Sequence, residues 1–336
     1  MKSVPVGEVE VSGKESGPAW RPKRLRRSGV IVLPILLLFV LPFFMESKVY
    51  ALHLLSMIYL NAIIMMGLVV ILGYTKQFSL GQVAFYGIGA YTTAILTAKL
   101  QVNFFLAMAF SGLFAGAAAA LVAIPASRFQ GPWLALVTFA FAEIARILMI
   151  RLKGLTGGFG GFFNIPKPSI GGLLFDNSFK YYFITLTVMI VVLWITHRVR
   201  RSALGRIWIS MGDNEDLSST LGINVFYHKI LAFSLGSFFA GVAGGIYAGY
   251  ASFISPENFT LRHTIYYLSI LIVGGLESIS GAIAATVMFT LFSSYLMALY
   301  PWDMVIFGLI IVLFVNLIPG GIGVHFEYLR SRLRIP

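Results

Sequence analysis

Long apolar stretches dominate the chain, and short polar or glycine-rich segments separate them. A helix needs about 20 mostly apolar residues to cross the hydrocarbon core of a membrane. The pattern predicts about ten membrane-spanning helices, at residues 29–45, 49–73, 77–98, 103–126, 132–151, 179–197, 229–252, 263–276, 281–300 and 303–318. The eighth of these, 263–276, is short and ends at Gly274-Gly275, so it is either a broken or re-entrant helix or runs into its neighbour.

The composition supports lipid as the solvent for most of this chain. Of 336 residues, 58% are hydrophobic and only 11% are charged, whereas a soluble protein has about a quarter of its residues charged. So few charges would leave a globular surface uncovered in water. The predicted fold is therefore all-α and polytopic, with a single transmembrane domain at residues 28–318 and patterns such as Gly112-x-x-x-Gly116 that favour close helix packing.

The distribution of Lys and Arg predicts the orientation. The chain has 25 basic and 13 acidic residues, but the basic ones cluster between apolar stretches, which fits membrane orientation better than nucleic-acid binding. If the amino terminus is cytoplasmic, the inside segments hold 15 basic residues from residue 21 on and the outside segments hold eight. We expect both termini inside, with residues 1–27 a disordered basic segment and 319–336 a cytoplasmic tail.

Two connecting loops are longer than a helix connection requires. The predicted outer loop, 152–178, is glycine-rich. The predicted inner loop, 198–228, is polar, with acidic residues that suit the start of a short helix and Gly222 as its stop. Such a helix would lie along the membrane face and present Leu217 and Leu221 on one side.

Polar residues in the third apolar stretch are candidates for a transport pathway. Ser79, Gln82, Tyr86 and Thr93 fall at helical spacings and share one face. They could line a cavity in a broken helix, or they could bond to neighbouring helices. In the fifth stretch, Glu143 and Arg146 are three residues apart, which allows either a local ion pair or a functional site.

Motifs that carry enzymatic chemistry are absent from the sequence. There is no cysteine, no nucleophile or metalloprotease motif, and no metal-spaced histidine group. We therefore predict no catalytic residue, no metal site and no cofactor bound by this chain. A phosphate-binding loop is also missing, so any ATP that drives the protein must be hydrolysed by a partner subunit.

Four groups of motifs, in order along residues of about 60–290, resemble one known family. Gly205-Arg206, Asn214-Glu215 and Leu221-Gly-Ile-Asn224 in the inner loop are similar to the coupling segment of permeases in ATP-binding-cassette importers. More specifically, the chain resembles the M-type permease subunit of branched-chain amino acid importers. The other groups are Leu72-Gly-Tyr-Thr75 through Gln82 with Gly87–Tyr91, Leu155–Gly158 with Ile165-Pro166, and Ile272–Leu276 with Ser280-Gly281.

Some positions depart from the family pattern. Lys76 and Glu277 stand where glycine is usual, Met211-Gly212 replace an Ile–Arg pair, and Ala282 replaces proline. Because Lys76 and Glu277 both lie in predicted inner turns, we expect them to be able to form a contact. The missing arginine weakens the transfer of partner contacts at that position.

The resemblance implies a permease subunit in the cytoplasmic (inner) membrane. It implies a second homologous permease subunit as a heterodimer partner, two ATP-binding subunits, an extracytoplasmic solute-binding protein and surrounding lipid. Branched-chain amino acids are the expected substrates; urea or short amides are an alternative, and a stand-alone secondary transporter is another. Expected pathway residues are Asn61, Ser79, Gln82, Tyr86 and Thr138, and expected ATPase-docking residues are Gly205, Asp213, Asn214, Glu215 and Gly222.

Overall fold

The computed structural model describes residues 39, 42, 49–129, 131–170, 173–175, 177–296, 302–317 and 321–323. The chain divides into two units, residues 1–44 and 45–336, and the description below concerns the second. The predicted first span, 29–45, lies outside the described residues except for Phe39 and Pro42. The predicted disordered segment 1–27 and the tail 319–336 lie outside them too, apart from residues 321–323.

Each of the other predicted spans is helical over most of its described residues. Five described helices, counting α2 and η1 as one, are long and apolar enough to cross a membrane, and α11 and α12 are shorter apolar helices. The chain is therefore a polytopic helical membrane protein, and its described residues add only two very short strands. The helices are α2 (Val49–Leu68), which continues as the π-helical η1 (Val69–Tyr74), α3 (Gln82–Ala98), α4 (Phe104–Ala126), α5 (Pro132–Arg151), α7 (Ser178–Arg201), α10 (Val225–Ala251), α11 (Leu261–Gly274), α12 (Ile279–Leu296) and α13 (Asp303–Leu317).

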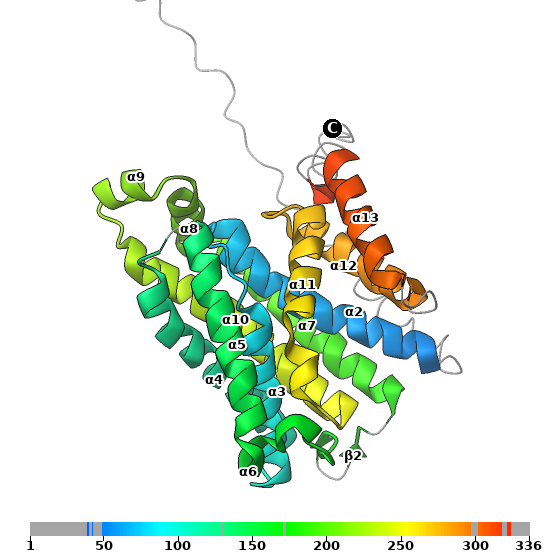
Figure 1. Ribbon diagram of the computed structural model, residues 1–336. Helices are drawn as coiled ribbons and strands as arrows, with labels where there is room; N and C mark the ends of the chain where they lie inside the picture. Colours follow the sequence, from blue (N-terminus) through cyan, green and yellow to red (C-terminus); the bar gives the residue numbers. More distant parts are fainter. Residues whose placement is uncertain are drawn as a thin grey trace, which may run out of the picture. The chain divides into compact units, whose positions relative to one another are not determined.

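Short elements connect these helices at two opposite ends of the helical unit (Figure 1). One end, which we name the α8 end, carries α8 (Ala203–Asp213) and α9 (Glu215–Thr220). The other, the α6 end, carries α6 (Lys153–Thr156) and η2 (Gly158–Gly160), the paired strands β1 (Ser169–Ile170) and β2 (Leu173–Leu174), and η3 (Pro256–Phe259). The two long predicted loops therefore lie at opposite ends, as expected from their places in the sequence.

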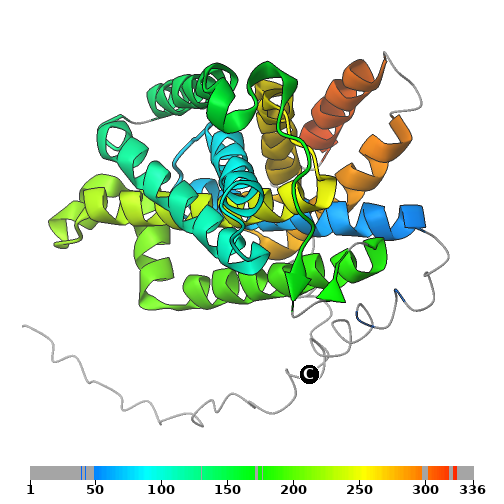
Figure 2. The same ribbon diagram turned by 90° about the horizontal axis from the view of Figure 1, so that it is seen from below.

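Helix α3 lies in the interior, packed against α4 and α10 (Figures 1 and 2). Glycines bring these backbones into direct contact: a Cβ added to Gly89 would overlap the carbonyl oxygen of Gly241, and one added to Gly244 would overlap that of Tyr86. Gly241 in turn packs against Gly112 and Ala115 of α4. The small-residue patterns thus act as helix-packing motifs, which hold helices together where lipid gives no hydrophobic drive to associate.

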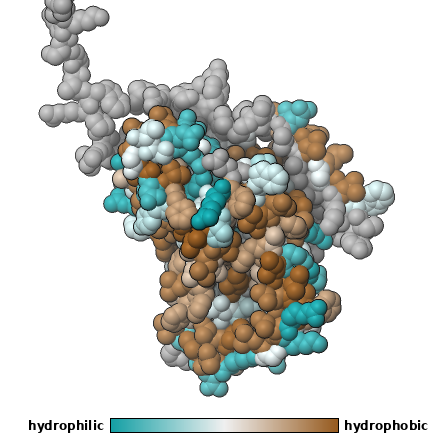
Figure 3. All heavy atoms as spheres, turned by 60° about the vertical axis from the view of Figure 1, so that its left-hand side comes forward, coloured by the Kyte–Doolittle hydropathy of each residue, from teal (hydrophilic) through white to brown (hydrophobic). Residues whose placement is uncertain are grey.

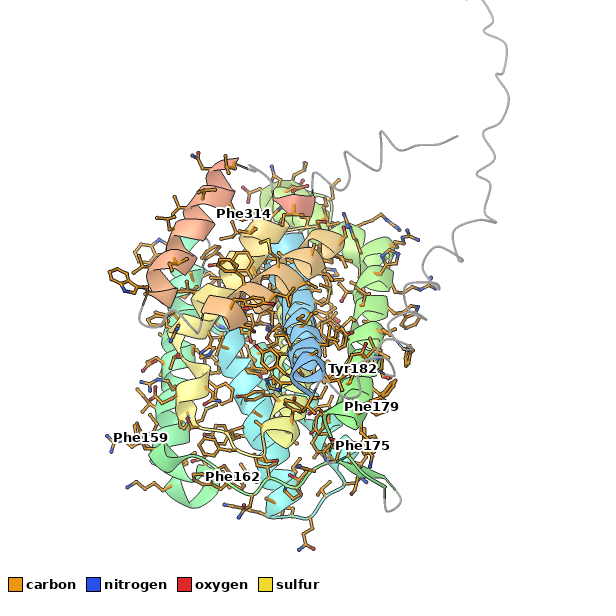
Figure 4. The ribbon with its side chains drawn as sticks, turned by 90° about the vertical axis from the view of Figure 1, so that its right-hand side faces the viewer. Phe159, Phe162, Phe175, Phe179, Tyr182 and Phe314 are labelled. Carbon is orange, nitrogen blue, oxygen red and sulfur yellow. The ribbon has the colours of Figure 1, made fainter. Side chains whose placement is uncertain are left out.

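Helix α7 covers α2 from the side. The hydroxyls of Tyr59 and Tyr182, both buried, are 2.9 Å apart and form a hydrogen bond between the two helices; Figure 4 shows Tyr182 on α7 beside α2. An interhelical hydrogen bond of this kind adds about 1 kcal/mol or less to association in a membrane.

The surface of the helices is apolar between two polar ends. Figure 3 shows a brown band of hydrophobic atoms with hydrophilic atoms above and below it. Large apolar side chains are exposed on α4 and α5, among them Leu121 and Trp133. Because exposed apolar surface of this extent is unfavourable in water, these faces require lipid or another membrane subunit as their environment.

Candidate functional site

The helix that was predicted at 77–98 begins only at Gln82, and an irregular buried segment precedes it. Thr75, Gln77 and Ser79 in this segment are each almost fully buried. Irregular backbone at membrane depth is tolerated only where protein groups satisfy it. Here the Leu80 backbone N–H donates to Thr138 Oγ1 at 2.9 Å, and the Thr264 hydroxyl donates to the Leu80 carbonyl at 3.4 Å.

The pathway candidates Ser79 and Thr138 meet at this break. The Ser79 hydroxyl accepts a hydrogen bond from the Gly81 N–H at 3.1 Å, and a Cβ on Gly81 would lie 3.2 Å from the Thr138 carbonyl oxygen. Ser79 therefore lies just before α3, and not on the helix face of Gln82, Tyr86 and Thr93 as the spacing had suggested. The helix starts late because side chains from α5 and α11 satisfy the broken backbone.

Gln82 bonds to a neighbouring helix, which is one of the two roles that its sequence position allowed. Its Nε2 donates to the Gly236 carbonyl of α10 at 3.1 Å, which is a helix-to-helix bond. Its Oε1 is buried and has no hydrogen-bond partner among the residues that the structure describes. Such a buried acceptor carries a free-energy penalty of about 1–3 kcal/mol unless it finds a partner.

Tyr86 lies one turn further along α3 and is nearly fully buried. Its ring packs against Tyr247 of α10, with ring centroids 5.6 Å apart, and against Phe259 of η3, at 5.5 Å. Sequence reasoning did not single out Phe259, because nothing local to it signals a contact with α3.

Asn61 belongs to a different polar cluster, between α2, α11 and α12. Its Nδ2 donates to Thr290 Oγ1 at 3.1 Å, and its Oδ1 accepts from the Tyr267 hydroxyl at 3.2 Å. Tyr267, a polar residue on the apolar helix α11, was the available sequence signal for one of these partners.

The inner loop forms two helices that meet at Asn214. The Asn214 side chain caps α9 by accepting a hydrogen bond from the Leu217 N–H at 2.9 Å, which ends α8 and starts α9. Gly222 stops α9 as predicted: its φ is +83° and its N–H donates to the Ser219 carbonyl at 3.0 Å. Asp213, Asn214 and Gly222 are exposed, and so are Leu217 and Leu221.

Two of the predicted docking residues face inward or lie buried. Gly205 is buried where a Cβ would overlap the Val199 carbonyl oxygen. Glu215 forms an ion pair with Lys229 of α10 at 2.7 Å, and Lys229 is only 4% exposed. The carbonyl of Lys229 also accepts from Gln77 Nε2 at 3.3 Å. Glu215 therefore connects α9 to α10 and, through Lys229, to the broken segment before α3.

Three of the departures from the family pattern, Lys76, Gly212 and Glu277, lie close together at the end of α8. Lys76 and Glu277 form an ion pair, which confirms the expected contact. A Cβ on Gly212 would lie 3.0 Å from Lys76 Cγ and 2.6 Å from the Tyr74 carbonyl oxygen. The end of α8 thus packs directly on the backbone that leads into the break.

Glu143 and Arg146 form the ion pair that their spacing predicted, at 2.5 Å. Arg146 also lies 3.6 Å from Glu257 of η3. Sequence reasoning missed this second partner, because 111 positions separate Arg146 from Glu257 in the chain and no local pattern relates them. Elsewhere, in the residues described, no three His, Asp or Glu side chains come together as metal ligands would.

The protein is polytopic and helical, an irregular segment interrupts its interior at the start of α3, and the short helices α8 and α9 lie at one end of the helices. These features are typical of a membrane transport permease. The family described as the permease component of branched-chain amino acid transport systems matches residues 50–315. The chain belongs to this family. As a permease subunit of an ATP-binding-cassette transporter of the inner membrane, it leaves ATP hydrolysis to a partner and needs no cofactor of its own.

Individual relatives agree with the family. The chain is 31% identical to the high-affinity branched-chain amino acid transport system permease protein LivM of Escherichia coli (strain K12), over 91% of this chain and 77% of the relative. It is 31% identical to LivM of Salmonella typhimurium over 84% and 71%. It is also 26% identical to the autoinducer 2 import system permease protein LsrC of Yersinia pestis over 85% and 83%. No solved structure matches the chain.

Proposed function

We propose that this permease subunit carries leucine, isoleucine and valine into the cytoplasm. The observation that carries the proposal is the 31% identity to LivM over 91% of the chain. Inside the protein, Gln82 supplies a buried acceptor without a described partner beside an irregular backbone segment. Such an acceptor suits the ammonium group of a small zwitterion without requiring a fixed charge in the membrane.

The proposed pathway runs past Ser79, Thr138, Gln82 and Tyr86, with Asn61 on a second wall. In this arrangement the chain has about ten spans, both termini in the cytoplasm, and the α8 end facing the cytoplasm. The greater number of basic residues on that side supports the orientation. The partners would be a second homologous permease as a heterodimer, two ATPases, and a solute-binding protein outside.

The ATPases would dock on the exposed part of α8 and α9. Asp213, Asn214 and Gly222 supply a polar surface there, and Leu217 and Leu221, 59% and 70% exposed, supply apolar contacts. Glu215 and Gly205 would act from beneath this surface, as connections to α10 and α7. A pull on α9 would then reach the pathway through Lys229 and Gln77.

The test is purification of the complex from its native membranes in mild detergent, followed by reconstitution into liposomes with its binding protein. We expect a second permease and an ATPase to co-purify, and labelled leucine to enter only with ATP. Uptake of urea, a nucleoside or another solute in place of leucine would replace the substrate assignment. Uptake without ATP by the chain alone would replace the importer assignment with a secondary transporter.

A further inference from the structure

The segment between α10 and α11 packs through η3 against the first half of α3. Within it, η3 places Phe259 against α3 with only 4% of the residue exposed. A Cβ on Gly87 would lie 2.9 Å from Phe259 Cγ, and the Phe259 ring also packs against Tyr91, with centroids 6.0 Å apart. Together with the contact to Tyr86, Phe259 covers the α3 face that the proposed pathway uses.

Polar contacts hold η3 in this place from two sides. Asn258 Nδ2 donates to the Tyr247 hydroxyl of α10 at 2.7 Å. On the other side, Arg146 of α5 is 3.6 Å from Glu257. The approach to η3 is fixed as well, because Phe162 and Ile254 pair through two backbone hydrogen bonds of 2.8 and 3.1 Å; Figure 4 shows Phe162 at the α6 end.

The carboxylates of Glu143 and Glu257 contact Arg146 from different elements, α5 and η3. Glu143 lies on the same helix as Arg146 and binds its Nε and Nη2, whereas Glu257 lies nearest Nη1, so the two carboxylates use different nitrogens of the guanidinium. Glu257 lies on η3 and its side chain is 55% exposed, so the attraction to Arg146 is that of a solvent-screened pair. A contact of this strength suits an element that must be held closed and also released.

We propose that Arg146 is a positioning residue for transport, which holds η3 and its Phe259 over Tyr86 and so closes the pathway toward the α6 end. This inference rests on the proposed pathway past Tyr86. Release of the Arg146–Glu257 pair lets Phe259 move off Tyr86 and opens that side. The same arrangement gives Arg146 a function beyond its local pair with Glu143.

The experiment exploits the absence of cysteine from the natural chain. A single Tyr86→Cys substitution places a thiol beneath Phe259, and its rate of reaction with a membrane-impermeant, positively charged thiosulfonate is measured from the side of the α6 end. Phe259→Ala in this background removes the cover and sets the maximum rate. Glu257→Gln and Arg146→Gln release η3, and Glu143→Gln is the matched control that leaves the Arg146–Glu257 contact in place.

We expect the labelling rate to rise about 2- to 5-fold with Glu257→Gln and with Arg146→Gln, the range for loss of one exposed ion pair, and to stay unchanged with Glu143→Gln. Arg146→Lys keeps the charge and should fall between the two. An unchanged rate with Phe259→Ala would refute Phe259 as the cover, and equal rates for Glu257→Gln and Glu143→Gln would refute Arg146 as its positioner. Labelling does not depend on transport, so failed leucine uptake would affect the substrate assignment alone.

Discussion

The ion pair between Glu215 and Lys229 gives the sharpest test of how the α8 end is held together. Lys229 is 4% exposed, and the Glu215 side chain is 30% exposed. Glu215→Gln leaves a buried ammonium without its counter-charge, whereas Lys229→Met leaves a carboxylate that still reaches water. The two single substitutions remove the same contact, but they should have unequal effects.

The magnitude follows from this difference in burial. Removing one partner from a fully buried ion pair costs about 3–5 kcal/mol. Because Glu215 is partly exposed, we expect about 2–3 kcal/mol for Glu215→Gln, a 30- to 150-fold rise in local opening at about 1.4 kcal/mol per factor of ten. Lys229→Met should cost only about 1 kcal/mol, and the double variant should recover most of the loss.

The assay is hydrogen exchange of residues 203–222 in the reconstituted complex, with ATP-dependent uptake measured in parallel. We expect faster exchange for Glu215→Gln than for Lys229→Met, and uptake that falls in the same order. Asp216→Asn is the matched control, since Asp216 is the exposed acidic neighbour of Glu215 on α9. Equal protection in all variants, or losses that add in the double variant, would refute the reasoning.

Three further predictions concern Gly222, the ion pair of Lys76 with Glu277, and Gly89. Gly222→Trp should abolish uptake and leave membrane insertion intact, whereas Gly222→Asn should retain most uptake, because Asn tolerates a positive φ. Normal uptake in the Trp variant would contradict ATPase docking at Gly222. Lys76→Gln or Glu277→Gln should lower the free energy of unfolding by less than about 1 kcal/mol, since the two side chains are 35% and 44% exposed. Thermal unfolding in detergent measures this change, and a larger loss would contradict the assignment of a solvent-screened pair. Gly89→Ala should destabilise the protein by about 1–3 kcal/mol or more in the same assay, and Gly308→Ala, with nothing near its Cβ, should not.

Much of the helical architecture could be predicted from the sequence, because membrane helices are specified by local apolar length. The stop at Gly222 and the contact of Lys76 with Glu277 were also predictable, the first from a local glycine signal and the second from the inner turns that hold both residues. These features depend on residues close in sequence or on the alternation of spans between the two sides.

The rest depended on partners that local patterns do not reveal. The late start of α3 at Gln82 requires the hydroxyls of Thr138 and Thr264, which come from other helices. Glu215 looked like a surface residue for a partner protein, but it turns toward Lys229, which a sequence pattern presents only as a cation near a helix start. For Arg146, the nearby Glu143 gave a sufficient account and concealed the distant Glu257.

The backbone contacts of α3 with α10 limit how this protein can change over evolution or in the laboratory. Where two side chains clash, a smaller residue on the partner helix restores the fit. A side chain at Gly89 or Gly244 would strike a main-chain carbonyl instead, and no second substitution can make a carbonyl smaller. These positions therefore have no compensating partner, and redesign of substrate selectivity in this permease should begin on faces of α3 other than the one that touches α10.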